Sequence, residues 1–130
     1  MDVRKELRAL GLVDAGAIRP VDSGRSCKAD LKVAFPEYVV FAFVVGDRIT
    51  FIGSASVGIK KRIGGAASAL RGIMENPHGH PLDPFKRFAP EVIRANQEIE
   101  VWAKESTAST YETEKEELNL KYEPAWLGRP

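Results

Sequence analysis

Several features that mark other classes of protein are scarce in this 130-residue chain. Its one cysteine, Cys27, excludes an internal disulfide. Its longest apolar run, residues 39–45, is far shorter than the roughly 20 residues that a membrane-spanning helix needs. The opening residues, MDVRKELRAL, contain no apolar stretch of the kind found in a secretory signal. These absences predict a cytoplasmic protein with no membrane partner.

Excess charge of one sign is also missing, because the net charge is only +1. The charges are nevertheless unevenly distributed along the chain. Residues 1–94 hold 15 basic and 10 acidic side chains, a net of +5, whereas residues 95–130 hold 4 and 8, a net of −4. This asymmetry is compatible with a basic surface that binds a polyanion such as a nucleic acid. It is equally compatible with an ordinary solvated acidic helix, and charge alone favours the latter.

The composition, 44% hydrophobic and 28% charged, is typical of a single globular domain. Residues 1–36 are predicted to form an N-terminal extension of one helix and one loop. Val3, Leu7 and Leu10 recur at helical spacing just before a glycine, where a helix would end. Residues 14–36 are rich in Gly, Ser, Asp and Pro, which is typical of loops.

A β-hairpin is the clearest element in the sequence. Residues 38–45 and 48–53 are mostly β-branched, aromatic or otherwise apolar, and Gly46 and Asp47 between them supply the two-residue loop that tight hairpins prefer. Both faces of this hairpin would be largely apolar. We therefore expect it to lie inside a sheet that is covered on both sides.

The two-residue loop also predicts a register for the hairpin. It places Ala42 opposite Phe51 and Val40 opposite Gly53. Directly opposed residues share a face of a sheet, so Val40 and Phe51 are expected on one face. Phe41 is expected on the other.

The rest of the chain predicts a helix, a third strand and a final helix. A helix after the hairpin is indicated by apolar residues at spacings of four, three, four and three: Ile59, Ile63, Ala66, Leu70 and Ile73. Alternation over residues 99–103 predicts the third strand, and the last helix ends before Pro124. Residues 37–130 are thus expected to form an α+β unit with a small three-stranded antiparallel sheet flanked by helices.

The segment YVVFAFVVGDRITFIG, followed by IKKRI and by a last helix ending in ELNLKYEPAWL, resembles the GIY-YIG nuclease superfamily over about residues 37–127. Phe51-Ile52-Gly53 takes the place of the family's Tyr-Ile-Gly motif, Arg62 that of the helix arginine, and Pro124–Trp126 that of most of the C-terminal tail. The resemblance implies a metal-dependent DNA endonuclease that hydrolyses phosphodiester bonds. DNA is then the expected partner and Mg²⁺ (or Mn²⁺) the expected cofactor.

The resemblance also implies catalytic roles for two residues near the hairpin. Arg62 would neutralise the phosphate in the transition state, as attack on an anion requires. The family's two tyrosines fall on Val40 and Phe51, which have no hydroxyl group. Tyr38, one alternation before Val40, is the nearest residue that could activate water in their place.

The last helix is expected to supply the metal ligand, and the hairpin helix further DNA contacts. A gapless alignment puts Lys115 at the position of the family's metal-binding glutamate. Glu114, about 70° away around the helix, is the best-placed carboxylate and is predicted to be both catalytic and metal-binding. Lys60, Lys61 and Arg71 are predicted to contact DNA phosphates.

These departures from the family pattern leave a second function open. The alternative is a catalytically inactive module of the same fold that binds nucleic acid or another protein. His78 and His80 are a weaker metal candidate, because no Cys or paired carboxylate follows them at regular spacing.

Overall fold

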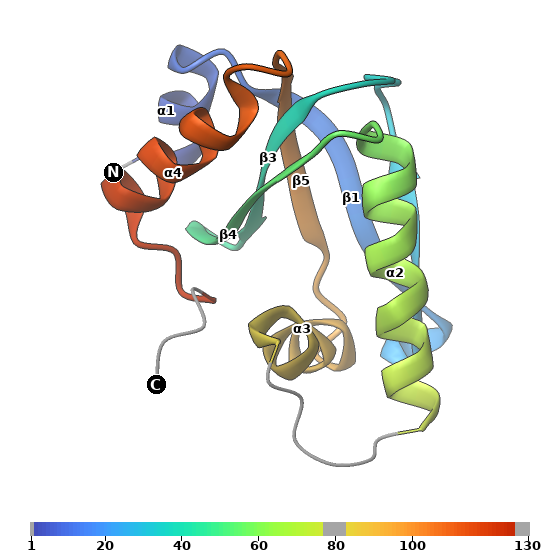
Figure 1. Cartoon of the computed structure of the whole chain (residues 1–130). Helices are drawn as coiled ribbons and strands as arrows, with labels where there is room; N and C mark the ends of the chain where they lie inside the picture. Colours follow the sequence, from blue (N-terminus) through green and yellow to red (C-terminus); the bar gives the residue numbers. More distant parts are fainter. Residues whose placement is uncertain (1, 77–82, 127–130) are drawn as a thin grey trace.

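The computed structural model describes residues 2–76 and 83–126 of the chain (Figure 1). In chain order the elements are α1 (Val3–Ala9), β1 (Val13–Val21), a 3₁₀ turn (Asp22–Gly24), β2 (Ser26–Leu31), β3 (Val39–Val45), β4 (Arg48–Ala55), α2 (Ile59–Glu75), α3 (Pro84–Arg94), β5 (Ile99–Glu105) and α4 (Tyr111–Tyr122). The strands form one sheet in the order β2-β1-β5-β3-β4, and all neighbouring pairs are antiparallel. None of the described helices is both long and apolar enough to cross a membrane.

The prediction of a three-stranded sheet was wrong, because the sheet in the described residues has five strands. The two additional strands come from residues 13–31, for which the sequence predicted mostly loop. Gly16 lies at a β-bulge in β1 with φ of 122°, and its missing side chain leaves room for the backbone of Asp30 on β2. The glycine that suggested a loop therefore permits close pairing of two strands.

The hairpin prediction is confirmed, but its register was wrong by one residue beyond the turn. Val45 pairs with Arg48 as expected, whereas Phe43 rather than Ala42 pairs with Phe51. An extra residue at Thr50 causes the shift, and the Thr50 hydroxyl donates to the carbonyl of Phe43 (3.3 Å). The bulge turns Phe51 onto the same face as Phe43.

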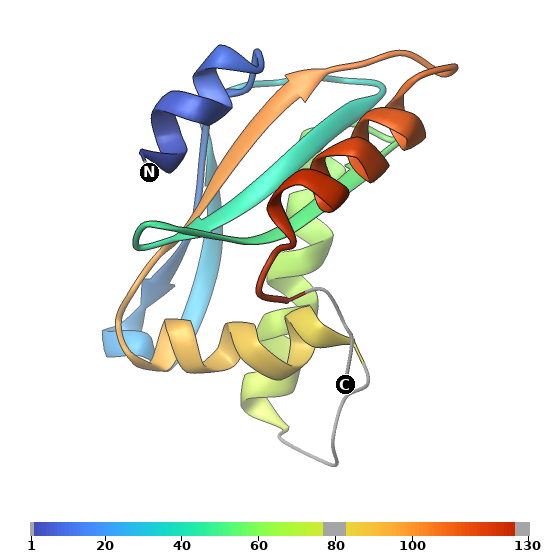
Figure 2. The ribbon, with the colours of Figure 1, turned by 90° about the vertical axis from the view of Figure 1, so that its left-hand side faces the viewer.

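Helices cover both faces of the sheet and enclose two apolar cores. Figure 1 shows α2 on one side of the sheet and α1 with α4 on the other, and Figure 2 looks onto the face that carries α1 and α4. The core beneath α2 and α3 contains Phe41, Phe43 and Ile63, all with 1% exposure or less. The core beneath α1 and α4 is built around Trp102 and Leu7. Because both faces are buried, β3 reads as a continuous apolar run.

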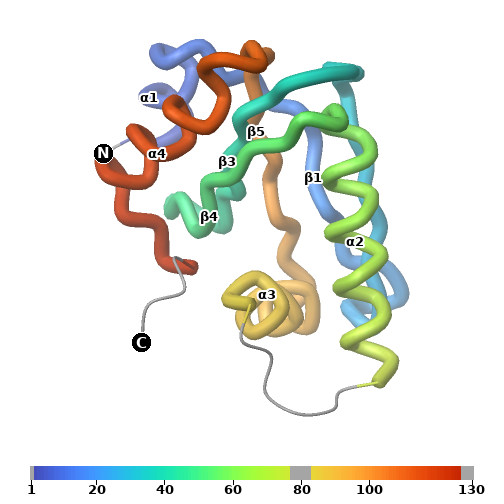
Figure 3. The backbone as a smooth tube through the Cα atoms, viewed as in Figure 1, coloured from blue at the N-terminus to red at the C-terminus, as the bar shows by residue number. Residues whose placement is uncertain are grey.

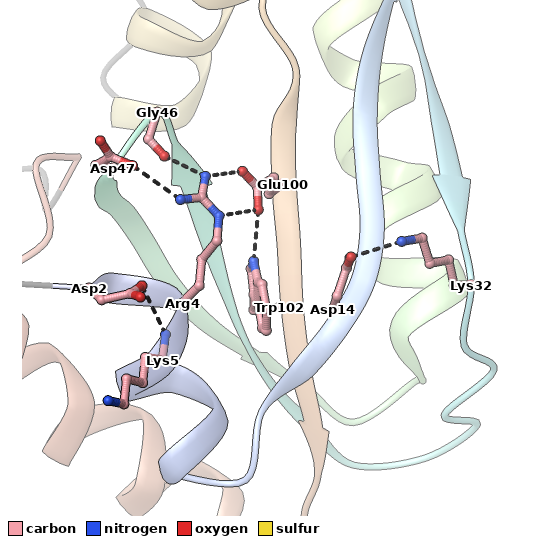
Figure 4. Close-up of polar contacts among 9 residues, drawn as sticks. All are labelled: Asp2, Arg4, Lys5, Asp14, Lys32, Gly46, Asp47, Glu100 and Trp102. Atoms are coloured by element: carbon pink, nitrogen blue, oxygen red, sulfur yellow. Dashed lines mark hydrogen bonds and ion pairs between the residues drawn. The ribbon is translucent and has the colours of Figure 1, made fainter.

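Polar contacts hold α1 against the hairpin turn and the central strand β5 (Figure 4). Arg4 donates to both carboxylate oxygens of Glu100, to Asp47 (3.1 Å) and to the carbonyl of Gly46. Trp102 donates its indole N–H to the same Glu100 carboxylate (3.1 Å). The guanidinium thus joins three segments that are distant in the sequence.

Replacing Arg4 with alanine should lower the free energy of unfolding by about 1 to 2 kcal/mol, because Glu100 would keep only its bond from Trp102. Urea denaturation at neutral pH measures the change, and Lys5→Ala, at an exposed position of the same helix, is the control. Equal losses in the two variants would show that the network contributes nothing specific.

Candidate functional site

A cavity of about 300 Å³ lies along β4, the strand at one edge of the sheet. β4 contributes residues 51–54, α2 contributes Arg62, and α4 contributes Lys115 and Asn119. Pro124 and Trp126, just after α4, complete its lining. Figure 3 shows β4 between α2 and α4. Side chains from both helices line the cavity.

Hydrogen bonds to the open edge of β4 hold α4 and the segment after it in place. Asn119 donates its side-chain N–H to the carbonyl of Ile52 (3.4 Å), and the backbone N–H of Trp126 donates to the carbonyl of Thr50 (2.6 Å). The helix ends at Tyr122 and is capped by Glu123, which has a left-handed backbone and directly precedes Pro124. These bonds use backbone groups that an uncovered edge strand would leave to solvent or to another chain.

Arg62 lies in the first turn of α2, with its guanidinium above the ring of Phe41 (5.2 Å to the centroid). Burial lowers the pKa of Arg62, and the negative charge of Asp83 partly opposes that effect. Within residues 2–76 and 83–126, no carboxylate forms an ion pair with this guanidinium. Arginine stays protonated in proteins, so Arg62 carries a half-buried positive charge that an anion would stabilise.

Gly53 shapes the floor of the cavity beneath Arg62. A Cβ atom at this position would lie only 2.7 Å from the rings of both Phe41 and Phe51. Glycine therefore lets the two rings close over the strand, with their centroids 6.0 Å apart. The glycine of the Phe51-Ile52-Gly53 motif has a packing role here.

Lys115 is the second cation that lines the cavity, and it contacts the carboxylate of Glu112 at the edge of the cavity. Its Nζ lies 3.1 Å from Glu112, which also accepts a hydrogen bond from the hydroxyl of Ser54 (3.3 Å). The hydrogen bond and positive charge of Lys115 lower the pKa of Glu112, and the hydrogen bond from Ser54 lowers it further. Arg62 and Lys115 thus face one cavity from opposite sides of β4.

Tyr38 and Glu114, the other two predicted catalytic residues, do not line this cavity. Tyr38 packs its ring against Tyr111 at the start of α4 (centroids 5.0 Å apart). Glu114 accepts a hydrogen bond from Ser106 (2.7 Å) and forms an ion pair with Lys104 (2.7 Å). The structure brings together Arg62 and Lys115, and it places Glu114 on a different side of α4.

The predicted DNA-binding residues occupy different parts of α2. Lys60 and Lys61 are exposed in its first turn, whereas Arg71, further along, donates to the carbonyl of Cys27 (3.2 Å). No group of three or more His, Cys, Asp or Glu side chains in the described residues could hold a metal ion. His78 and His80 lie outside those residues.

Asn119 and Ser54 are site residues that sequence reasoning missed. A signal for Asn119 was present, because it follows Lys115 by four residues and so lies on the same side of a helix. Ser54 carried no comparable signal. Its position at the cavity depends on the bulge at Thr50, which the sequence pattern does not reveal.

We expect Glu114→Gln to reduce stability without changing the cavity. Burial raises the pKa of Glu114, but hydrogen bonds from Lys104, Ser106 and Thr110 outweigh it and the net shift is downward. A carboxylate with a lowered folded-state pKa stabilises the fold above its unfolded pKa of about 4.3, and this contribution is lost as the pH falls through the folded value.

The variant should therefore lose about 1 kcal/mol at pH 7, and the difference from the original protein should shrink towards zero below about pH 4. Urea denaturation across this pH range measures it, with the exposed Glu116→Gln as the control. A loss at pH 7 no larger than that of the control would contradict the assignment.

Two nucleases of known structure share this fold. EndoII of bacteriophage T4, in a mutant form, superposes with a TM-score of 0.73 at 15% identity, covering 97% of this chain and 98% of EndoII. The restriction endonuclease Hpy188I, in complex with product DNA, superposes with a TM-score of 0.58 at 14% identity, covering 95% of this chain and 82% of that enzyme. No protein-family profile and no curated protein sequence matches the chain. The chain therefore has a fold that these two nucleases share over almost its whole length.

Proposed function

We propose that this protein binds DNA and holds a backbone phosphate between Arg62 and Lys115. The observation that carries the proposal is the convergence of these two cations, from different helices, on one cavity in which Arg62 has no ion-pair partner among the described residues. A guanidinium donates two parallel hydrogen bonds to a phosphate, and an ammonium adds a point charge. Such contacts supply most of the affinity of proteins for DNA and fix its position.

The shared fold supports DNA as the source of that phosphate, since one of the two similar structures is a nuclease with product DNA. We further propose that the chain is a member of the GIY-YIG superfamily. Three separated parts of the resemblance, Phe51–Gly53, Arg62 and Pro124–Trp126, meet around one cavity. Random matches to three short patterns would have no reason to converge in this way.

The residues of the cavity do not fit a divalent metal ion. Mg²⁺ is held by oxygen ligands, usually including at least one carboxylate. Here the lining contains two cationic side chains and, among the described residues, no carboxylate. We therefore expect DNA binding that requires neither Mg²⁺ nor Mn²⁺.

Phosphodiester hydrolysis is the second candidate, favoured by the position of Glu112. Its carboxylate contacts both Ser54 and Lys115, which line the cavity. A carboxylate at that rim could accept a proton from water while Arg62 stabilises the negative charge that develops on the phosphate. Its lowered pKa weakens it as a base, so we rank binding first. The catalytic roles of Tyr38 and Glu114 stay predictions.

A supercoiled plasmid distinguishes the two candidates. We expect the protein to retard the plasmid in a salt-dependent manner and to leave it intact with Mg²⁺ or Mn²⁺. Nicking that is lost in both Arg62→Ala and Glu112→Gln would establish hydrolysis instead. Glu114→Ala and Tyr38→Phe in the same assay test the roles predicted for those residues. If the plasmid were neither retarded nor nicked, that result would contradict DNA binding and leave a protein-interaction role.

A further inference from the structure

A second cavity of about 300 Å³ adjoins the first, between α2 and α3. Phe51 and Arg62 line both cavities. α2 and α3 contact each other and share one core, and Figure 1 shows both apart from α1 and α4. A ligand group held against Arg62 in the first cavity would therefore lie against a residue that also lines the second.

The second cavity differs from the first in chemistry, because most of its wall is aromatic and aliphatic. Phe43 and Phe51 stack with centroids 5.5 Å apart at an interplanar angle of 30°, and Phe85 packs on Phe43 at the same centroid distance. Four charged residues complete the lining: half-buried Arg62 and exposed Lys61, Asp83 and Lys86. A cavity of this volume, with apolar walls and a few polar groups, is typical of small-ligand sites.

We propose that the second cavity accepts an unstacked nucleobase from the nucleotide whose phosphate is held by Arg62. This inference rests on the proposed DNA binding and adds the kind of DNA that is preferred. Aromatic walls provide stacking surfaces for the flat face of a base, and any base can use them. The lining holds three cationic side chains and one carboxylate, Asp83, so its net charge is positive and attracts the adjoining phosphates.

The proposal predicts a preference for DNA with an unpaired nucleotide. A base within a duplex is stacked and paired, and extruding it costs a few kcal/mol. A bulged base avoids most of that cost. The same bulge built with an abasic residue keeps the phosphates and loses the group that fills the cavity.

Gly65 offers a way to fill the second cavity without disturbing the first. It is exposed on α2 and lines only the second of the two, and a Cβ atom there would meet nothing within 4 Å. Leucine favours a helix more than glycine does, so Gly65→Leu should fold. Gly72→Leu is a matched control, because Gly72 is also exposed on α2 with open space around it and lines neither cavity.

Fluorescence anisotropy with two labelled duplexes, one with a single bulged base and one with an abasic bulge, tests the inference. We expect the original protein and Gly72→Leu to bind the bulged base about tenfold more tightly than the abasic bulge. Gly65→Leu should bind both duplexes with the same affinity, equal to that of the original protein for the abasic bulge.

Equal binding of the two duplexes by the original protein would overturn the base cavity and leave phosphate binding standing. An unchanged tenfold preference in Gly65→Leu would also overturn it. Failure to bind either duplex would contradict the proposed DNA binding, and the base cavity with it.

Discussion

Lys115→Glu is expected to weaken DNA binding by about 100-fold at low salt. The substitution removes one of the two cations that face the cavity and places a negative charge where the phosphate would lie. Like charges brought together at an interface cost several kcal/mol, and each 1.4 kcal/mol is about a factor of ten in affinity. Fluorescence anisotropy with EDTA present measures the loss without a divalent ion bridging the new carboxylate and the phosphate.

Lys121→Glu is the matched control for this charge reversal. Lys121 is exposed on the same helix and packs over the ring of Tyr122, outside the lining of the cavity. The control should lose only the small affinity expected from a general change in net charge. Equal losses in the two variants would contradict a localised phosphate site at Lys115.

Gly53→Ala is expected to have the second large effect, on both stability and binding. The added methyl group would lie 2.7 Å from the rings of Phe41 and Phe51, so both rings would have to move. Overpacking of this kind costs about 1 to 3 kcal/mol. Because Arg62 lies over the ring of Phe41, its guanidinium should be displaced and DNA binding should fall by about tenfold.

Urea denaturation and anisotropy together measure these two consequences. Gly64→Ala on α2 is the matched control, because a Cβ atom there meets nothing within 4 Å and alanine favours a helix. The control should gain about 0.5 to 1 kcal/mol of stability. A Gly53→Ala protein with unchanged stability and affinity would show that the close approach of the rings does not position Arg62.

The sequence allowed the prediction of elements whose pattern is local. Gly46 and Asp47 identify the hairpin, and the apolar spacing from Ile59 onwards identifies α2. It did not reveal β1 and β2, since Gly16 and Pro20 resemble loop residues until a pairing partner is known. Pairing between β1 and β5 joins residues about 85 positions apart, which no local window contains.

The register of the hairpin explains why the site was only partly predicted. A one-residue bulge at Thr50 reverses the faces of the residues that follow, so Phe51 joins Phe41 instead of Val40. Arg62 was predicted from its helix position, and the structure places it at the cavity. Helical spacing likewise indicated that Lys115 faces inward. Whether Lys115 or the neighbouring Glu114 reaches the cavity depends on how α4 is rotated against β4, which the sequence does not reveal.

The most direct measurement is a crystal structure of the protein with a short single-stranded deoxyoligonucleotide. We expect one backbone phosphate within hydrogen-bonding distance of both the Arg62 guanidinium and the Lys115 ammonium. An oligonucleotide bound with all its phosphates on another surface, and only solvent between those two side chains, would contradict it.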